Sequence, residues 1–231
     1  MRSSERGEEE SAVNIEEYLE QLPEGAVRQR KDGTYTVVPR IRMGRIDAEL
    51  LDAVNRAVRQ FGLGGVRLAA NQRLMIDGVP ESVLKGVVEA VGAVGDPCAC
   101  PVQACPGAAG CRRGLQDSTA MADRLEKVLA AFEFPAKLKA SVSGCPMCCA
   151  EPMVRDVGLF GGKRGWTVAF GGNSGRRVRQ GDVLAENVSK EEAFAVIGKV
   201  LAFYVENAKK KERTARFMER VGIDAARAAI L

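Results

Sequence analysis

The cysteines set the strongest limit on what this 231-residue chain can fold around. The chain has seven of them and no histidine, and three lie within five positions in the segment SGCPMCCAEP, residues 143–152. Without histidine the chain has no imidazole to bind metal or to act as a general base. The segment itself is compatible with a redox dithiol, with half of a zinc site or with part of a larger thiolate cage, so the other cysteines decide between these.

Two separated pairs of cysteines favour the cage. One pair stands in CPGAAGC with five residues between the thiols, and the other in CPMCC with three between its outer thiols. Four thiolates suit a [4Fe–4S] cluster or a structural zinc ion. Zinc ribbons usually have two residues between the ligands of each half, a spacing that only Cys145 and Cys148 provide. Glycines and prolines around the pairs fit backbone N–H groups that bond to sulfur. The predicted ligands are Cys105, Cys111, Cys145 and Cys149.

The remaining cysteines have a plainer interpretation. Four ligands complete the cage, so we interpret Cys98, Cys100 and Cys148 as small buried residues. A redox dithiol formed by Cys145 and Cys148 would leave the first pair of cysteines unexplained.

Composition excludes several classes of protein. A net charge of +4 with 5% aromatic residues does not indicate a nucleic-acid-binding protein. The N-terminus, MRSSERGEEESAV, is charged and lacks the apolar region of a signal peptide. Apolar runs stay well short of the 18 or so residues that a membrane span needs. We therefore expect a cytoplasmic protein without nucleic-acid or membrane partners, whose thiols stay reduced.

Hydrophobic periodicity predicts an α+β protein. The first half has expected helices at 14–22, 47–61 and 80–92, with Asn14 and Asp47 as N-caps. Expected strands at 34–42, 65–69 and 73–78 complete a β-α-β-(β)-α pattern of roughly ferredoxin-like kind. In the second half we expect a loop at 96–116, a helix at about 116–131, strands at 137–143, about 154–160 and 165–170, a glycine-rich basic loop at 171–182, and a long helix capped by Ser189 and followed by one or two short helices.

Basic residues lie beside the cysteine motif. Lys137 and Lys139 are two apart on a predicted strand and so face the same side, either as a solvated face or as an anion pocket. The glycine-rich loop carries Arg176, Arg177 and Arg179, which form either surface charge or a clamp for carboxylates. Its glycines would allow the backbone to approach a cofactor closely.

Taken together, these stretches resemble the sirohaem-dependent sulfite and nitrite reductases. The resemblance is carried by the two spaced cysteine pairs, by KLKASVSGCP, by GWTVAFGGNSGRR and by CRRGLQDS, and it covers roughly residues 34–220. It implies a ferredoxin-like N-terminal unit followed by a mixed α/β unit that binds sirohaem and a [4Fe–4S] cluster. The expected domains are a disordered tail at 1–13, the ferredoxin-like half domain at 14–95 and the cluster and sirohaem domain at 96–231.

The resemblance also implies roles for individual residues. The four predicted ligands would hold the cluster, and Cys149 would also be the axial ligand of the sirohaem iron. Lys137 and Lys139 would be the catalytic lysines that bind sulfite or nitrite. The expected neighbours of the sirohaem are Asn71, Gln72, Arg73, Gly171, Gly172, Asn173 and Arg176.

The implied activity is the multi-electron reduction of sulfite, or of nitrite, with an external donor such as a ferredoxin. The second hypothesis is an electron-transfer or sensing protein that keeps the cluster but does not turn over substrate at a sirohaem. The third is a zinc-stabilised binding module.

Two features depart from the family pattern. Where the family has an arginine in a stretch like L-T-x-R-Q, this chain has Asn71 in LAANQRL, and Arg67 and Arg73 are the candidates to replace it. Larger members of the family hold two copies of the unit and this chain holds one. We therefore expect either a homodimer related by two-fold symmetry or a small monomer.

Overall fold

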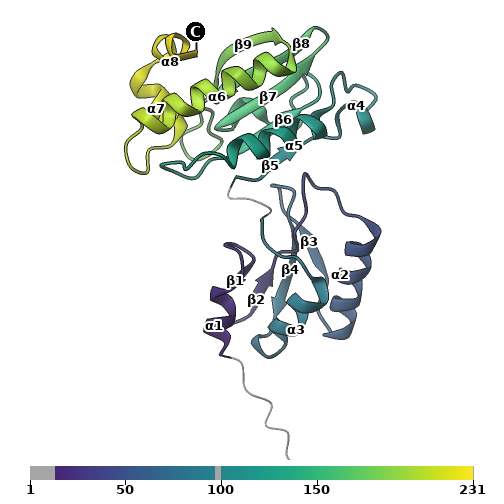
Figure 1. Cartoon of the computed structure of the whole chain (residues 1–231). Helices are drawn as coiled ribbons and strands as arrows, with labels where there is room; N and C mark the ends of the chain where they lie inside the picture. Colours follow the sequence, from purple (N-terminus) through teal and green to yellow (C-terminus); the bar gives the residue numbers. More distant parts are fainter. Residues whose placement is uncertain (1–13, 97–99, 231) are drawn as a thin grey trace, which may run out of the picture. The chain divides into compact units, whose positions relative to one another are not determined.

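The computed structural model describes residues 14–96 and 100–230 (Figure 1). Contacts divide them into two compact units. The first contains residues 14–40, 47–69 and 73–96, and the second contains 41–46, 70–72 and 100–230. The tail expected at 1–13 and Cys98 lie outside the described residues. Among the described helices, none is long and apolar enough to cross a membrane.

The first unit is a four-stranded antiparallel sheet with helices, as the ferredoxin-like pattern predicts. The strand order is β1-β2-β4-β3. Its sheet packs against helices through residues that are fully buried, among them Val37, Ile76 and Leu84. The elements are α1 (Ile15–Glu20), β1 (Val27–Gln29), β2 (Tyr35–Val37), α2 (Ala48–Gln60), β3 (Val66–Leu68), β4 (Leu74–Val79) and α3 (Glu81–Val91).

Local capping explains where these helices begin. The Asp47 carboxylate accepts a hydrogen bond from the Leu50 N–H at 2.9 Å, and the Asn14 side chain accepts one from Glu16. Both predicted N-caps are confirmed. The stretch LAANQRL contains the turn between β3 and β4, which lies between the two strands expected at 65–69 and 73–78. Strand β2 is shorter than the predicted range 34–42, and β1 was not predicted.

The second unit is built on a five-stranded mixed sheet of order β5-β6-β7-β8-β9. Strands β5, β6 and β7 are parallel to one another, and β7, β8 and β9 are antiparallel. The elements are β5 (Val102–Ala104), α4 (Gly107–Gly110), α5 (Ser118–Leu129), β6 (Ala140–Ser143), the 3₁₀ helix η1 (Pro152–Val154), β7 (Val157–Gly162), β8 (Gly165–Phe170), β9 (Asp182–Val188), α6 (Lys190–Asn207), α7 (Thr214–Val221) and α8 (Ile223–Ile230).

Helices α5 and α6 cover one face of this sheet (Figure 1). The core between them includes Leu125, Leu159 and Ile197, all fully buried. Ser189 caps α6 in a complete capping box with Glu192, as predicted. Strands β5 and β9 were not predicted: β5 lies within the expected loop at 96–116, and β9 follows the expected basic loop at 171–182.

A buried carboxylate ties β6, β7 and α7 together. Asp156 is 1% exposed, and it accepts hydrogen bonds from the Lys139 N–H at 2.8 Å, from the Arg213 guanidinium and from the Thr214 hydroxyl. An ion in this position is stable only because every acceptor site has a partner.

Replacing Asp156 with alanine should therefore lower the free energy of unfolding by about 2–4 kcal/mol, since Arg213 and the Lys139 N–H lose their acceptor together. Urea denaturation followed by circular dichroism measures the change. The control is Asp52→Ala on the exposed face of α2, which should shift stability by less than about 0.5 kcal/mol. Equal effects of the two substitutions would contradict the structural role of Asp156.

Candidate functional site

Two cysteine-bearing loops meet at Gly144. The first loop follows β5 and holds Cys105 and Cys111, and the second follows β6 and holds the remaining three described thiols of the site. The backbone N–H groups of Leu115 and Gln116 both donate to the Gly144 carbonyl at 2.9 Å. Because β5 and β6 are adjacent parallel strands, both loops leave the sheet at the same edge.

Glycine is required at this meeting point. A Cβ atom on Gly144 would lie 2.6 Å from the Gly107 Cα, and one on Gly114 would lie 2.3 Å from the Gly107 carbonyl carbon. Both distances are well below any that a real Cβ atom adopts, so the two backbones approach more closely than side chains allow. The sequence analysis noted the glycines in general but did not single out Gly144.

The thiols gather around this contact. The Cys105 sulfur accepts a hydrogen bond from the Gly144 N–H at 3.2 Å, and the Ser118 hydroxyl lies 3.6 Å from the same sulfur. Burial raises the pKa of the Cys148 thiol, and the nearby thiols of Cys145, Cys149 and Cys105 raise it further. The thiols of Cys145, Cys149 and Cys105 therefore all lie close enough to Cys148 to affect its pKa.

The fourth predicted ligand belongs to the same edge of the sheet. Cys111 is exposed, and its N–H donates to the Gly107 carbonyl at 2.9 Å. In the part of the chain that the structure describes, no three Cys, Asp or Glu side chains form a ready metal-ligand set. The donor set fits a [4Fe–4S] cluster, because it offers soft thiolates from two loops and an N–H already bonded to one sulfur.

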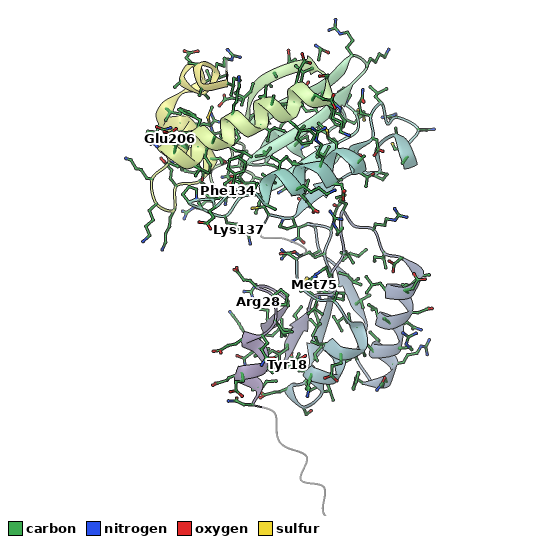
Figure 2. The ribbon with its side chains drawn as sticks, viewed as in Figure 1. Tyr18, Arg28, Met75, Phe134, Lys137 and Glu206 are labelled. Carbon is green, nitrogen blue, oxygen red and sulfur yellow. The ribbon has the colours of Figure 1, made fainter. Side chains whose placement is uncertain are left out.

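The lysine pair lies beyond the other end of β6. That strand begins at Ala140, later than the predicted 137, but the alternation continues before it. Lys137 and Lys139 are exposed while Leu138 between them is 2% exposed, so both lysines face the same side as predicted. Figure 2 labels Lys137 at the margin of the second unit. Cys145 lies six positions after Lys139, about 20 Å of extended chain, so the structure does not bring the lysine backbone next to the thiols.

The glycine-rich loop is held mainly by the protein itself. A Cβ atom on Gly171 would lie 2.5 Å from the Met218 side chain, and one on Gly172 would lie 2.6 Å from the Arg155 carbonyl oxygen. Asn173 and Arg179 exchange two backbone hydrogen bonds of 2.9 Å. The close approach that glycine permits is thus used, at least in part, for packing within the protein.

The arginines of that loop have different surroundings. Arg179 donates to the Gly171 carbonyl at 2.8 Å and pairs with Asp182. Arg177 lies 3.5 Å from the Glu219 carboxylate. Arg176 is exposed and has no ion-pair partner among residues 14–96 and 100–230, so its guanidinium is available to an anionic ligand.

The side chains near Asn71, which stands where the family pattern has an arginine, mostly have partners within the protein. Asn71 is exposed at the tip of the β3–β4 turn. The Gln72 amide bonds to the Ala104 backbone, with its Nε2 donating to the carbonyl at 2.8 Å. Arg73 forms an ion pair with Asp96, and Arg67 lies 3.1 Å from the Asp77 carboxylate. Both candidate replacements for the arginine therefore have carboxylate partners of their own.

Further cations flank the cysteine loops. The Gln116 side chain donates to the Gly162 carbonyl at 3.0 Å, which holds the β7–β8 turn against the first cysteine loop. Four exposed cations lie on these two segments, and none has an ion-pair partner within the described residues. They are Arg112, Arg113, Lys163 and Arg164. The sequence analysis quoted CRRGLQDS but assigned no role to its arginines, and only the fold shows that the β7–β8 turn joins them.

Comparison with known protein families identifies both halves of the chain. Residues 95–231 match the model described as the nitrite and sulphite reductase 4Fe-4S domain. Residues 27–94 match the nitrite/sulfite reductase ferredoxin-like half domain.

Individual relatives agree with the family models. The chain is 43% identical over 213 residues to an assimilatory-type sulfite reductase of Nitratidesulfovibrio vulgaris, and the match covers 90% of this chain and 98% of the relative. It is 34% identical over 212 residues to the nitrite reductase (NADH) large subunit of Escherichia coli, and covers 25% of that protein. It also covers 25% of a Bacillus subtilis nitrite reductase, at 36% identity.

Solved structures share the fold. The NirA protein of Mycobacterium tuberculosis superposes with a TM-score of 0.74 at 24% identity, over 87% of this chain and 41% of NirA. A dissimilatory sulfite reductase I has a TM-score of 0.70 at 15% identity, over 85% of this chain and 68% of its own.

Substituting Gly144 with alanine should reduce the iron bound by the purified protein at least fivefold, because the two cysteine loops must separate to accommodate a Cβ atom. Iron and acid-labile sulfide analysis measures the effect. Gly198→Ala on α6 is the matched control, since a Cβ atom there meets nothing within 4 Å. It should keep the iron content and add helix stability. Unchanged iron in Gly144→Ala would show that the loops do not need this contact.

Proposed function

The chain belongs to the nitrite and sulfite reductase family of oxidoreductases, and from this premise we propose that it reduces sulfite to sulfide. The observation that carries the choice of substrate is similarity. The chain is 43% identical to the sulfite reductase relative, and 36% and 34% identical to the two nitrite reductases, of which it matches 25% each. Reduction of nitrite to ammonia is the alternative activity of the same site.

The cofactors are a [4Fe–4S] cluster and sirohaem. In our proposal the cluster is held by Cys105, Cys111, Cys145 and Cys149. Cys149 would also be a ligand of the sirohaem iron. When bound, the pair supplies the electrons and the iron site that the reduction needs. The exposed position of Cys149 suits a ligand that is shared with a second group.

The backbone of Gly144 stabilises a thiolate and orients the two cysteine loops. A thiolate is stabilised when an N–H group points at its sulfur, and the Gly144 N–H does so for Cys105. The same glycine fixes the spacing of the two loops through its carbonyl, so one residue both orients the ligands and stabilises their charge. No side chain can be placed there without moving one loop.

The cations bind and orient anions. Lys137 and Lys139 are proposed as the catalytic lysines that attract the oxyanion and supply protons as its oxygens leave as water. Their exposure, their common side and the lack of an ion-pair partner within the described residues support this role. Arg176 is proposed to meet a sirohaem carboxylate, since Arg pairs with carboxylates in a two-point geometry. The other proposed sirohaem neighbours are Asn71, Gln72, Arg73, Gly171, Gly172 and Asn173.

The partners follow from the chemistry. A ferredoxin is our proposal for the carrier that supplies the electrons, and the given sequence shows no flavin or nicotinamide motif. A homodimer is proposed as the state in which a single-unit chain would complete the site. An electron-transfer protein with the cluster alone is the second candidate, and Asn71 in place of the family arginine is the observation that favours it.

Substituting Cys149 with serine should remove sulfite reduction entirely, since the ligand proposed for both cofactors is lost. The assay uses anaerobic protein, a reduced viologen dye and sulfide detection, with ammonia formation from nitrite measured in parallel. Cys148→Ser is the neighbouring control and should keep at least half of the activity. If the wild type consumes neither oxyanion while it holds iron and sulfide, the electron-transfer candidate replaces the proposal.

Replacing Lys137 or Lys139 with alanine should lower kcat/KM for sulfite by about 10²-fold, by analogy with the loss of other charged donors at a developing negative charge. Steady-state kinetics over a range of sulfite concentrations measures the effect. Lys210→Ala, at an exposed lysine between α6 and α7, is the control and should leave kcat/KM unchanged. A loss of less than threefold in both variants would remove the lysines from the catalytic site.

A further inference from the structure

The strand that leads into the first cysteine loop lies at the edge of its sheet. Strand β5 pairs with β6 on one side only. In a parallel pair, alternate residues direct their N–H and C=O groups to the neighbouring strand, and the others direct them outward. The Cys105 N–H donates to the Val142 carbonyl at 3.2 Å, so Val102 and Ala104 are the residues whose polar groups face away from β6. Unpaired backbone groups at such an edge normally bond to water or to another strand.

Two side chains satisfy this edge instead. The Ala104 N–H donates to the Gln72 Oε1 at 3.2 Å, while the Gln72 Nε2 donates to the Ala104 carbonyl at 2.8 Å. The Val102 N–H donates to the Glu126 Oε1 at 3.2 Å. The Gln72 amide thus repeats the donor and acceptor pattern of a neighbouring strand's peptide group.

The supporting residues fix these side chains in place. Gln72 has a backbone φ of +61°, which a non-glycine residue adopts only where its surroundings require it. Gly44 lies beside the Gln72 side chain, since a Cβ atom on the glycine would be 3.4 Å from the Gln72 Cβ. Glu126 is 5% exposed, and its second oxygen accepts a hydrogen bond from the Arg42 Nε at 3.1 Å.

We propose that Gln72 is a positioning residue for the first ligand loop: its amide holds Ala104, and through it Cys105, in the register that a cluster needs. Ala104 precedes Cys105 directly, and the rigid peptide plane between them passes the constraint to the thiol. Both polar atoms of the Gln72 side chain are occupied by this contact. The inference rests on the proposed function, because it takes Cys105 to be a cluster ligand.

Gln72→Met tests the two hydrogen bonds separately from packing. Methionine has a similar length and no amide, and the two Ala104 groups would be left without partners. Gln103→Met is the matched control on the same strand, since the Gln103 amide makes a single exposed bond of 3.3 Å to the Ala70 carbonyl.

The first readout needs no cofactor. Hydrogen exchange of the amides in residues 102–105 of the full chain, followed by mass spectrometry, should be about tenfold faster in Gln72→Met than in the wild type, and unchanged in Gln103→Met. The rate at which a chelator removes iron from the anaerobically purified protein is the second readout. It should also rise about tenfold in Gln72→Met.

A conservative variant provides the rescue. In Gln72→Glu a protonated carboxyl group can donate to the Ala104 carbonyl and accept from its N–H, as the amide does, but an ionised carboxylate can only accept and would face the carbonyl oxygen. Iron release relative to the wild type should therefore be about tenfold faster at pH 8 and clearly less accelerated at pH 5, where part of the carboxyl group is protonated. A residue that matters only through packing would give the same ratio at both pH values.

The outcomes separate this inference from the proposed function. If all variants match the wild type in exchange and in iron release, Gln72 does not position the loop, although the cluster assignment stands. If the wild type binds no iron but hydrogen exchange at 102–105 is still faster in Gln72→Met, the hold of Gln72 on Ala104 is supported and the cluster assignment fails.

Discussion

The backbone contact between Gly144 and the loop around Gly107 is the constraint on which the rest of the site depends. Both loops adjoin only short elements: the first has β5, with three residues, and α4, with four, and the second follows β6, with four. The two loops instead stabilise each other through the hydrogen bonds of Leu115 and Gln116 to the Gly144 carbonyl. Thiols that are distant in sequence are thereby brought to one edge of the sheet.

The parallel part of the sheet determines how charge is distributed around that edge. Both cysteine loops and the β7–β8 turn leave the sheet at the carboxyl ends of β5, β6 and β7, where Arg112, Arg113, Lys163 and Arg164 add unpaired positive charge. Lys137 and Lys139 lie at the amino end of β6 instead. The proposed catalytic lysines and the thiols therefore lie at opposite ends of β6.

Features with local causes could be predicted from the sequence, whereas features that depend on distant residues could not. Asp47 and Ser189 identify their helices because an N-cap bonds within its own first turn. The spacing of the cysteines predicts the kind of site because ligand chemistry is independent of fold. Strands β1 and β5 have three residues each, too few to show a period. The contact of Gln72 with Ala104 could not be predicted, because the two residues lie 32 positions apart in the sequence. The role of Gly144 depends equally on the other loop.

The most direct test of the account is the ultraviolet–visible spectrum of anaerobically purified protein, expressed with a supply of sirohaem, recorded before and after the addition of sulfite. The account predicts intense Soret and long-wavelength chlorin bands that shift when sulfite is added, because the thiols on the two loops hold both cofactors and leave the iron open to the oxyanion. A spectrum with only the broad shoulder of an iron–sulfur cluster, unchanged by sulfite, would contradict the assignment of this chain as a sulfite reductase.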